Sequence, residues 1–314
     1  MIKQILTLVI LCWVSYATAQ YSNCYHYLTN KAHHVFFWKQ DAKTALAIYE
    51  QREKIQPDLL AYDAFQVALA HAHLENYDKA FDYLKMAVRK GTTLKGIEEG
   101  GKGIYFTTSE KHWIQFKKEY PTLRQVFLKN FDVELYVEIS EMLAIEQYLR
   151  TKIYMKDKNK TTAGYFVKKD SVNMRRLMEI TKQQGFPTEA QVGPQANYKF
   201  FLLFLHGLTK NVWAYDFFKV QLKKAIFEGS ISPDVYAQAI DRHLLSGKKQ
   251  PIRYGTYNKS DKEFSPIEDP ANIDKRRMDI GLLPLHENWE FKKGWTPPKG
   301  YVPIKAEDYL KCWE

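Results

Sequence analysis

A histidine and an aspartate in the C-terminal half have the residue types needed for general acid–base chemistry. His206 lies in the apolar segment 200–208, where a buried imidazole needs a hydrogen-bond partner. Asp241 can be that partner and can hold the ring in one tautomer. We therefore expect His206 and Asp241 to form a catalytic pair, with His206 as the base. The alternative is a histidine that only fills the core.

Arginines and other polar side chains are concentrated between Asp241 and Pro284. A guanidinium can bind a carboxylate or a phosphate through two parallel hydrogen bonds. We therefore expect a ligand-binding site made by Arg242, Gln250, Tyr254, Thr256, Arg276 and Arg277. The alternative is an ion-pair network that fixes the loop to the helices, with the acidic partners Glu268, Asp269 and Asp274.

The segments around these residues have the punctuation of helices. Glycine and proline delimit helices over 170–184, 194–208, 211–228 and 233–247. Asp170, Ser232 and Asp269 are expected to cap helices, because a short polar side chain can accept a hydrogen bond from a free backbone N–H. Residues 248–268 are expected to form a long irregular loop, and such loops are often functional. No segment alternates as a strand would, so the fold class is mainly α.

The N-terminal half has the pattern of paired helices, with interruptions at Pro57 and Pro121. Residues 62–90 resemble a tetratricopeptide repeat, in which Tyr77 opens the second helix and small or apolar residues follow at its packing positions, namely Ala80, Leu84 and Ala87. About three such units are needed for an independent array. We therefore expect this helical pair to pack against the α-helical C-terminal domain.

The first nineteen residues have the features of a secretory signal. Lys3 precedes an apolar run, and residues 17–19 have the small-residue cleavage pattern Ala-Thr-Ala. We expect export to the periplasm or medium of a bacterium, with cleavage after Ala19. Cys24 and Cys312 then remain near the two ends, either as a disulfide or as two free thiols.

Composition and motifs exclude several classes of protein. The formal net charge is +10, with a basic stretch between Arg150 and Lys182. In an exported chain we interpret that stretch as a solvated face and expect no nucleic-acid partner. No segment after the signal is long and apolar enough to span a membrane. The sequence contains no motif typical of a metal site or a bound cofactor, so we expect neither.

A set of short motifs in the C-terminal half resembles a bacterial family catalogued as a domain of unknown function. The shared positions cover about 165–290 and include Asp170, Arg176-Leu177, Gly185-Phe186-Pro187, His206, Asp241-Arg242, Gln250, Tyr254-Gly255-Thr256, Glu268-Asp269-Pro270, Asp274 and Arg276-Arg277. Two positions depart from the family pattern, which has glutamine where this chain has Leu205 and Tyr257. The resemblance implies a shared fold and site, but no reaction.

These observations predict five regions and two candidate functions. The regions are a signal peptide over 1–19, a tetratricopeptide-like part over 20–150, a basic linker over 151–168, the helical domain over 169–290 and a tail over 291–314. We expect a cell-envelope binding protein, with a protein partner for the helical half and an acidic peptide or glycan for the arginine site. The alternative is a hydrolase-like enzyme that uses His206 and Asp241, with arginine stabilising negative charge. The sequence does not indicate the oligomeric state.

Overall fold

The protein is mainly α-helical, as the sequence predicts, and its described residues form no β-strand. The computed structural model describes residues 23–99, 103–156, 160–209, 211–260, 263–289, 295–310 and 312. The expected signal segment lies outside this range. Two isolated β-bridges, between Ile252 and Ile267 and between Asn258 and Phe264, are the strand-like contacts of the described chain. None of its described helices is long and apolar enough to cross a membrane.

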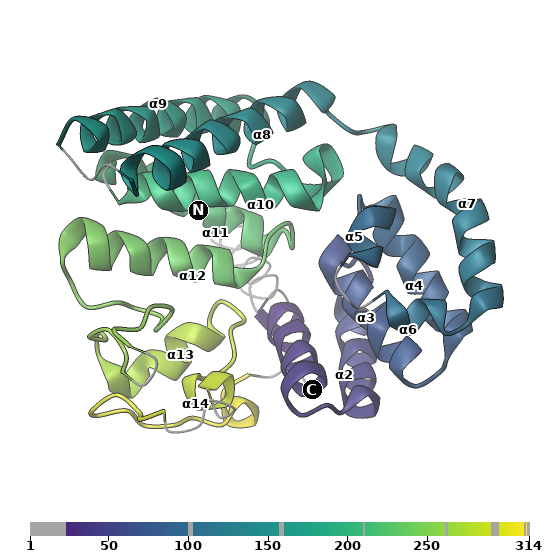
Figure 1. Cartoon of the computed structure of the whole chain (residues 1–314). Helices are drawn as coiled ribbons and strands as arrows, with labels where there is room; N and C mark the ends of the chain where they lie inside the picture. The colour runs from purple at the N-terminus through teal and green to yellow at the C-terminus, as the bar shows by residue number, and fades with distance from the viewer. Residues whose placement is uncertain are drawn as a thin grey trace, which may run out of the picture.

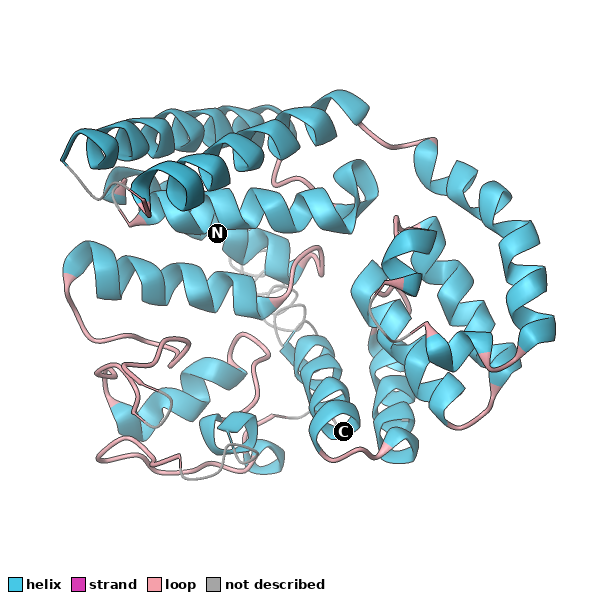
Figure 2. Ribbon diagram, viewed as in Figure 1, coloured by secondary structure: helices cyan, strands magenta, loops and turns pink. Residues whose placement is uncertain are grey.

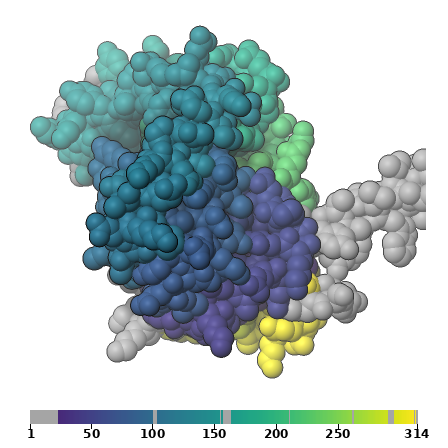
Figure 3. Space-filling view, turned by 90° about the vertical axis from the view of Figure 1, so that its right-hand side faces the viewer, coloured from purple at the N-terminus to yellow at the C-terminus, as the bar shows by residue number. Residues whose placement is uncertain are grey.

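The N-terminal half is a stack of helices on one side of the molecule (Figures 1 and 2). Residues 23–38 are helical, and they are followed by α2 (Ala42–Ile55), α3 (Ala61–His73), α4 (Tyr77–Arg89), α5 (Leu94–Glu98), α6 (Ile104–Thr107) and α7 (Glu110–Leu128). The buried alanines Ala68, Ala72, Ala80 and Ala87 let α3 and α4 lie close together. Figure 3 shows α7 crossing the outer face of this stack.

The C-terminal half is a second helical layer around one large apolar core. Its helices are α8 (Val133–Tyr148), the π-helix η1 (Leu149–Tyr154), α9 (Lys160–Gln184), α10 (Glu189–Leu208), η2 (Val212–Ala214), α11 (Tyr215–Phe227), α12 (Pro233–Arg242) and η3 (His243–Lys248). A smaller unit follows after the long loop, with η4 (Pro270–Asn272), α13 (Ile273–Met278), α14 (Leu285–Trp289) and η5 (Ala306–Asp308). The expected irregular loop over 248–268 is present, since its described residues after Lys248, the end of η3, form no helix or strand.

The helix over residues 23–38 joins the two halves. Its Asn30 donates a hydrogen bond to the carbonyl of Gly281 at 2.9 Å, and its His26 contacts the carbonyl of Ile226 at 2.8 Å. Tyr27 and Leu28 pack in one apolar cluster with residues of α13 and of the C-terminal tail. Cys24 forms a disulfide with Cys312, which resolves the alternative left open by the sequence. The tail is therefore part of the folded unit.

The predicted linker over 151–168 is mostly helical instead. The π-helix η1 continues from α8 through Tyr154, and α9 begins at Lys160. α8 packs along α10, so it belongs with the C-terminal layer, although the sequence analysis placed it in the N-terminal region. The sequence did not indicate η1 or the first turns of α9, because their described residues are exposed or half-buried and form no apolar stripe.

Two predicted helix boundaries and one predicted capping bond are also wrong. Asp170 lies in the middle of α9, where it is buried, so it is not a cap. Asp269 precedes η4, but its side chain caps no helix. It instead accepts a hydrogen bond from the side-chain Nδ2 of Asn272 at 2.8 Å. Pro121 does not interrupt the helix but lies within α7. It is exposed, as is Lys117 one turn earlier, so the carbonyl that loses its partner can face water.

Candidate functional site

His206 is held by a glutamate from another helix rather than by Asp241. Its Nδ1 atom lies 3.1 Å from Oε1 of Glu146, which belongs to the last turn of α8 and is 1% exposed. Because an ionised carboxylate only accepts hydrogen bonds, this contact places the proton on Nδ1 and leaves Nε2 as an acceptor. The prediction that Asp241 orients His206 is wrong.

Arg150 and Asp170 extend this contact into a charged cluster. Arg150 forms ion pairs with Glu146 and with Asp170, whose Oδ2 lies 2.9 Å from Nη2. The guanidinium also stacks on Phe166, with 3.7 Å between its carbon and the ring centroid. We call Glu146, Arg150, Asp170, His206 and Arg242 the polar cluster.

Arg242 completes the polar cluster from the last turn of α12. Its Nε donates a hydrogen bond to Oγ1 of Thr209 at 2.9 Å, and its guanidinium lies 5.8 Å from the ring of Tyr257. Among the described residues, no carboxylate forms an ion pair with Arg242. Tyr257 stands where the family pattern has glutamine, so this departure lies beside the polar cluster.

Burial and neighbouring charges set the protonation states in this cluster. Burial, together with the positive charges of Arg150 and Arg242, lowers the pKa of His206 to about 4. The imidazole is therefore neutral near pH 7 and its Nε2 can accept a proton or a hydrogen bond. Burial raises the pKa of Asp170, although the adjacent Arg150 opposes that shift. The cluster thus contains a neutral base, two paired carboxylates and one arginine without a carboxylate.

Asp241 holds the start of the long loop in place. Its fully buried carboxylate accepts backbone hydrogen bonds from Arg253, Tyr254 and Thr256 at 2.7–2.9 Å, and a fourth from the Thr256 hydroxyl at 2.8 Å. Together these bonds fix the first turn of the long loop onto α12. Tyr254 and Thr256 are predicted ligand contacts. In the structure both donate their backbone N–H groups to Asp241, and Thr256 also donates its hydroxyl.

The other predicted ligand contacts lie away from the polar cluster. Arg276 donates to the backbone carbonyls of Arg253, Glu268 and Asp269 and pairs with the Asp269 carboxylate at 3.6 Å. Arg277 is buried and donates to the carbonyl of Leu283 at 2.7 Å and to that of Tyr254. These contacts fix the loop, as in the alternative expected from the sequence, but most of them are bonds to backbone carbonyls. Of the three expected acidic partners, Asp269 forms an ion pair with Arg276, whereas Asp274 pairs with His286. Gln250 is exposed after η3.

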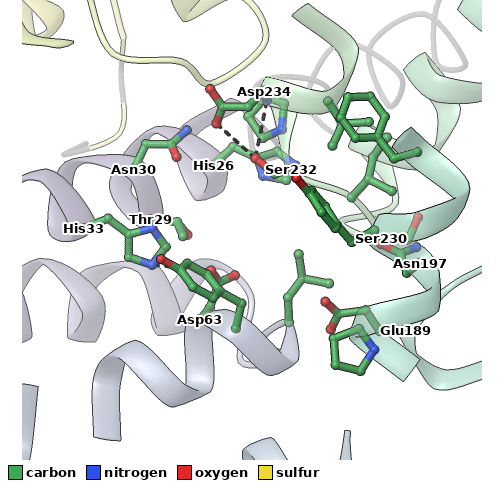
Figure 4. Close-up of a pocket in the computed structure, with 18 residues that line it drawn as sticks. His26, Thr29, Asn30, His33, Asp63, Glu189, Asn197, Ser230, Ser232 and Asp234 are labelled. Carbon is green, nitrogen blue, oxygen red and sulfur yellow. Dashed lines mark hydrogen bonds and ion pairs between the residues drawn. The ribbon is translucent and has the colours of Figure 1, made fainter. Parts of the chain in front are cut away.

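A separate cavity of about 520 Å³ lies between the helix over 23–38, α3, α10 and the start of α12 (Figure 4). We call it the interhelical cavity. Its polar side chains come from both halves of the molecule and are His26, Thr29, Asn30, His33, Asp63, Glu189, Asn197, Ser230, Ser232 and Asp234. No sequence motif links these positions, and the first and last of them, His26 and Asp234, are 208 residues apart.

Sequence reasoning missed Glu146 and Arg150 in the polar cluster and every residue of the interhelical cavity. One signal for Glu146 was present: it continues the buried stripe of α8 set by Leu135, Ile139 and Met142. A charged residue at such a position needs a partner. Among the described residues, no three His, Cys, Asp or Glu side chains are grouped so as to hold a metal ion.

Comparison with known proteins places the polar cluster in a family domain. Residues 133–293 match the model of a family of unknown function, DUF6624. All five residues of the polar cluster lie inside this range, whereas only part of the interhelical cavity does. No curated protein and no solved structure matches the chain. The matched range covers 161 of the 314 residues (133 to 293 inclusive), and the chain therefore belongs to the DUF6624 family of unknown function.

Proposed function

We propose that this chain is an exported binding protein that holds an acidic group of a peptide or glycan at the polar cluster, with Arg242 as the main contact. The observation that carries the proposal is the unequal pairing of the two arginines. Arg150 contacts two carboxylates, whereas Arg242 has a hydroxyl partner in Thr209 and no carboxylate in the described chain. An acidic ligand group would supply the missing charge partner.

The surroundings of Arg242 support a polar ligand. Tyr257 lies beside the guanidinium, and Thr209 holds its Nε, so the two terminal nitrogens keep a fixed direction. A guanidinium held in this way loses little conformational entropy when it binds. The neutral His206 adds an acceptor at Nε2 for a hydroxyl or amide of the same ligand.

Export is supported by two observations. The first nineteen residues have a signal-like pattern, and the Cys24–Cys312 disulfide is of a kind that persists in oxidising compartments. The protein partner that we expect for the N-terminal helical half is part of the same proposal. It is supported by the paired helices α3 and α4, which resemble a tetratricopeptide repeat in sequence.

A thermal-shift screen of residues 20–314 tests the binding proposal. Suitable probes are glucuronate, glutarate and inorganic phosphate, with glucose as the uncharged counterpart of glucuronate. A ligand at 100 times its dissociation constant stabilises the folded state by about 2.7 kcal/mol. We expect stabilisation by an acidic probe, none by glucose, and loss of the effect in Arg242→Gln. The absence of stabilisation by every acidic probe contradicts the proposal.

The second candidate is a hydrolase-like enzyme, favoured by the contact between Glu146 and His206. A carboxylate on Nδ1 and a free Nε2 are the arrangement of a general base that activates a nucleophile or water. Arg242 would then stabilise developing negative charge. His206→Gln separates the two candidates, because it removes the base. Loss of turnover with retained binding would identify an enzyme, whereas unchanged binding in a protein without turnover would support the binding role.

A further inference from the structure

The interhelical cavity has an unusual charge for a chain as basic as this one. The whole sequence carries a formal net charge of +10. Yet among the described residues that line the cavity, none is lysine or arginine, and three are acidic: Asp63, Glu189 and Asp234. The cavity therefore attracts positive charge.

The walls of the cavity are mostly apolar and aromatic. Tyr62, Tyr198 and Phe201 line it together with aliphatic side chains. Its volume of about 520 Å³ falls within the range of about 300–1,000 Å³ that is typical of small-molecule sites, which are apolar with a few placed polar groups. Aromatic faces also attract organic cations.

Two of the three acidic groups, Asp63 and Glu189, face the cavity from opposite halves of the molecule. Figure 4 shows Asp63 with His33 and Thr29 on one wall, and Glu189 with Asn197 and Ser230 on the other. Asp63 is 5% exposed, and its Oδ1 lies 3.4 Å from Nε2 of His33. Glu189 accepts a hydrogen bond from the backbone N–H of Ala61 at 2.7 Å, which ties α10 to the start of α3.

We propose that the interhelical cavity binds a small organic cation, a protonated primary amine on an apolar body. The ammonium group would lie between Asp63 and Glu189, and the apolar body would contact the tyrosines and Phe201. This site is separate from the polar cluster and does not depend on the function proposed there.

Proton release gives this site a distinctive signature. Burial raises the pKa of Asp63 to about 6, and burial with the neighbouring charge of Asp63 raises that of Glu189 to about 7. An ammonium group favours the ionised carboxylates, so binding near pH 6.5 displaces protons. Other titratable or charged groups around these carboxyls are the imidazoles of His26 and His33, the carboxyl of Asp234, and Asp58, Arg52 and Lys90 beyond the cavity lining.

Titration calorimetry of residues 20–314 with phenethylamine and its uncharged counterpart 2-phenylethanol tests the proposal. We expect saturable binding of the amine, at least tenfold weaker binding of the alcohol, and a measured enthalpy that depends on the ionisation enthalpy of the buffer at pH 6.5. Glu189→Gln should weaken amine binding at least tenfold and remove most of the buffer dependence. Glu228→Gln, which changes an exposed carboxylate directly after α11, should leave both unchanged.

The two variants at the cavity differ in risk to the fold. Glu189→Gln keeps an oxygen that can accept the hydrogen bond from the Ala61 N–H, so this variant should fold, and its circular dichroism spectrum checks that. Asp63→Asn changes a more deeply buried group and provides the second test if it folds. Equal affinity for amine and alcohol, unchanged amine affinity in Glu189→Gln, or no binding of the amine would each overturn the proposal.

Discussion

The Nδ1 atom of His206 and the Oε1 atom of Glu146 lie 3.1 Å apart, although sixty residues separate them along the chain. This contact joins α10 to α8 and makes the histidine part of a charged cluster. The same glutamate pairs with Arg150, so one buried carboxylate serves an imidazole and a guanidinium. Glu146, Arg150, Asp170 and His206 thus form one connected set of contacts within the polar cluster.

Arg150 should be the member of this unit that matters most for stability. Arg150→Ala leaves Glu146 and Asp170 buried without their cation, and breaking a buried pair typically costs about 3–5 kcal/mol. Arg150 is a quarter exposed, so we expect the lower end, about 3 kcal/mol, in urea unfolding.

Arg176→Ala is the matched control for Arg150→Ala. Arg176 also contacts two carboxylates, Glu138 and Glu179, but these pairs are at the surface. Surface pairs contribute about 0–1 kcal/mol. Equal losses in the two variants would contradict a buried, interdependent cluster.

The disulfide should contribute strongly to stability because it closes almost the whole folded chain. Cys24 and Cys312 are 288 residues apart in sequence. Loss of a native disulfide typically costs about 2–5 kcal/mol, chiefly by releasing the unfolded chain. Cys312→Ser should therefore lower the midpoint of thermal unfolding, and a reductant should lower that of the wild type but not of the variant. An unchanged midpoint in the variant would show that the ends are held without the bond.

Asp241 should act on the loop and not on chemistry at His206. Asp241→Asn replaces two accepting oxygens with one, so some of its four donors lose their partner. Each hydrogen bond to a charged group contributes about 1.5–3 kcal/mol. Hydrogen exchange should speed up at the amides of Arg253, Tyr254 and Thr256, with little change at α10. Selective loss of protection around His206 would instead support a direct pairing with Asp241.

Glu189 should make stability depend on pH in a defined direction. Its pKa is raised from 4.5 to about 7 in the folded state, so the folded protein holds the proton more tightly than the unfolded chain. The stability contributed by this proton is complete below about pH 4.5 and is lost as pH rises through about 7. Relative to wild type, Glu189→Gln should therefore gain stability between pH 5 and pH 8.

The quantity to compare is the difference in unfolding free energy between wild type and Glu189→Gln at each pH, since other groups titrate nearby. His26 has a pKa lowered to about 4, so its contribution changes with pH in the opposite direction. It is common to both proteins and cancels in the difference. A stability difference that is flat from pH 5 to pH 8 would show that Glu189 titrates normally.

Local chemistry made much of the fold predictable. The Ser232 hydroxyl accepts from the Asp234 amide at 3.3 Å and starts α12 as expected. α4 begins at Tyr77 as predicted, after a turn in which Glu75 has a positive φ of 57°. Such signals depend on neighbours in sequence, which one chain contains in full.

The composition of the polar cluster could be predicted only in part. His206 and Arg242 were identified, because their residue types are unusual in their segments. The partner of His206 was not, because it is chosen by how α8 packs on α10, and no spacing in the sequence encodes that choice. Arg150 was interpreted as part of a solvated basic stretch for the same reason: its partner Asp170 is brought close only by the fold.

Binding of an acidic group at Arg242 is best measured by titration calorimetry with glucuronate, using wild type, Arg242→Gln and Arg175→Gln. Arg175 is a matched control, since it is exposed on α9 and its guanidinium lies 5.9 Å from the ring of Trp213, much as Arg242 lies near Tyr257. We predict that the wild type binds glucuronate saturably, that Arg175→Gln retains this binding and that Arg242→Gln weakens it at least tenfold. Equal weakening by both variants, or no binding by the wild type, would contradict it.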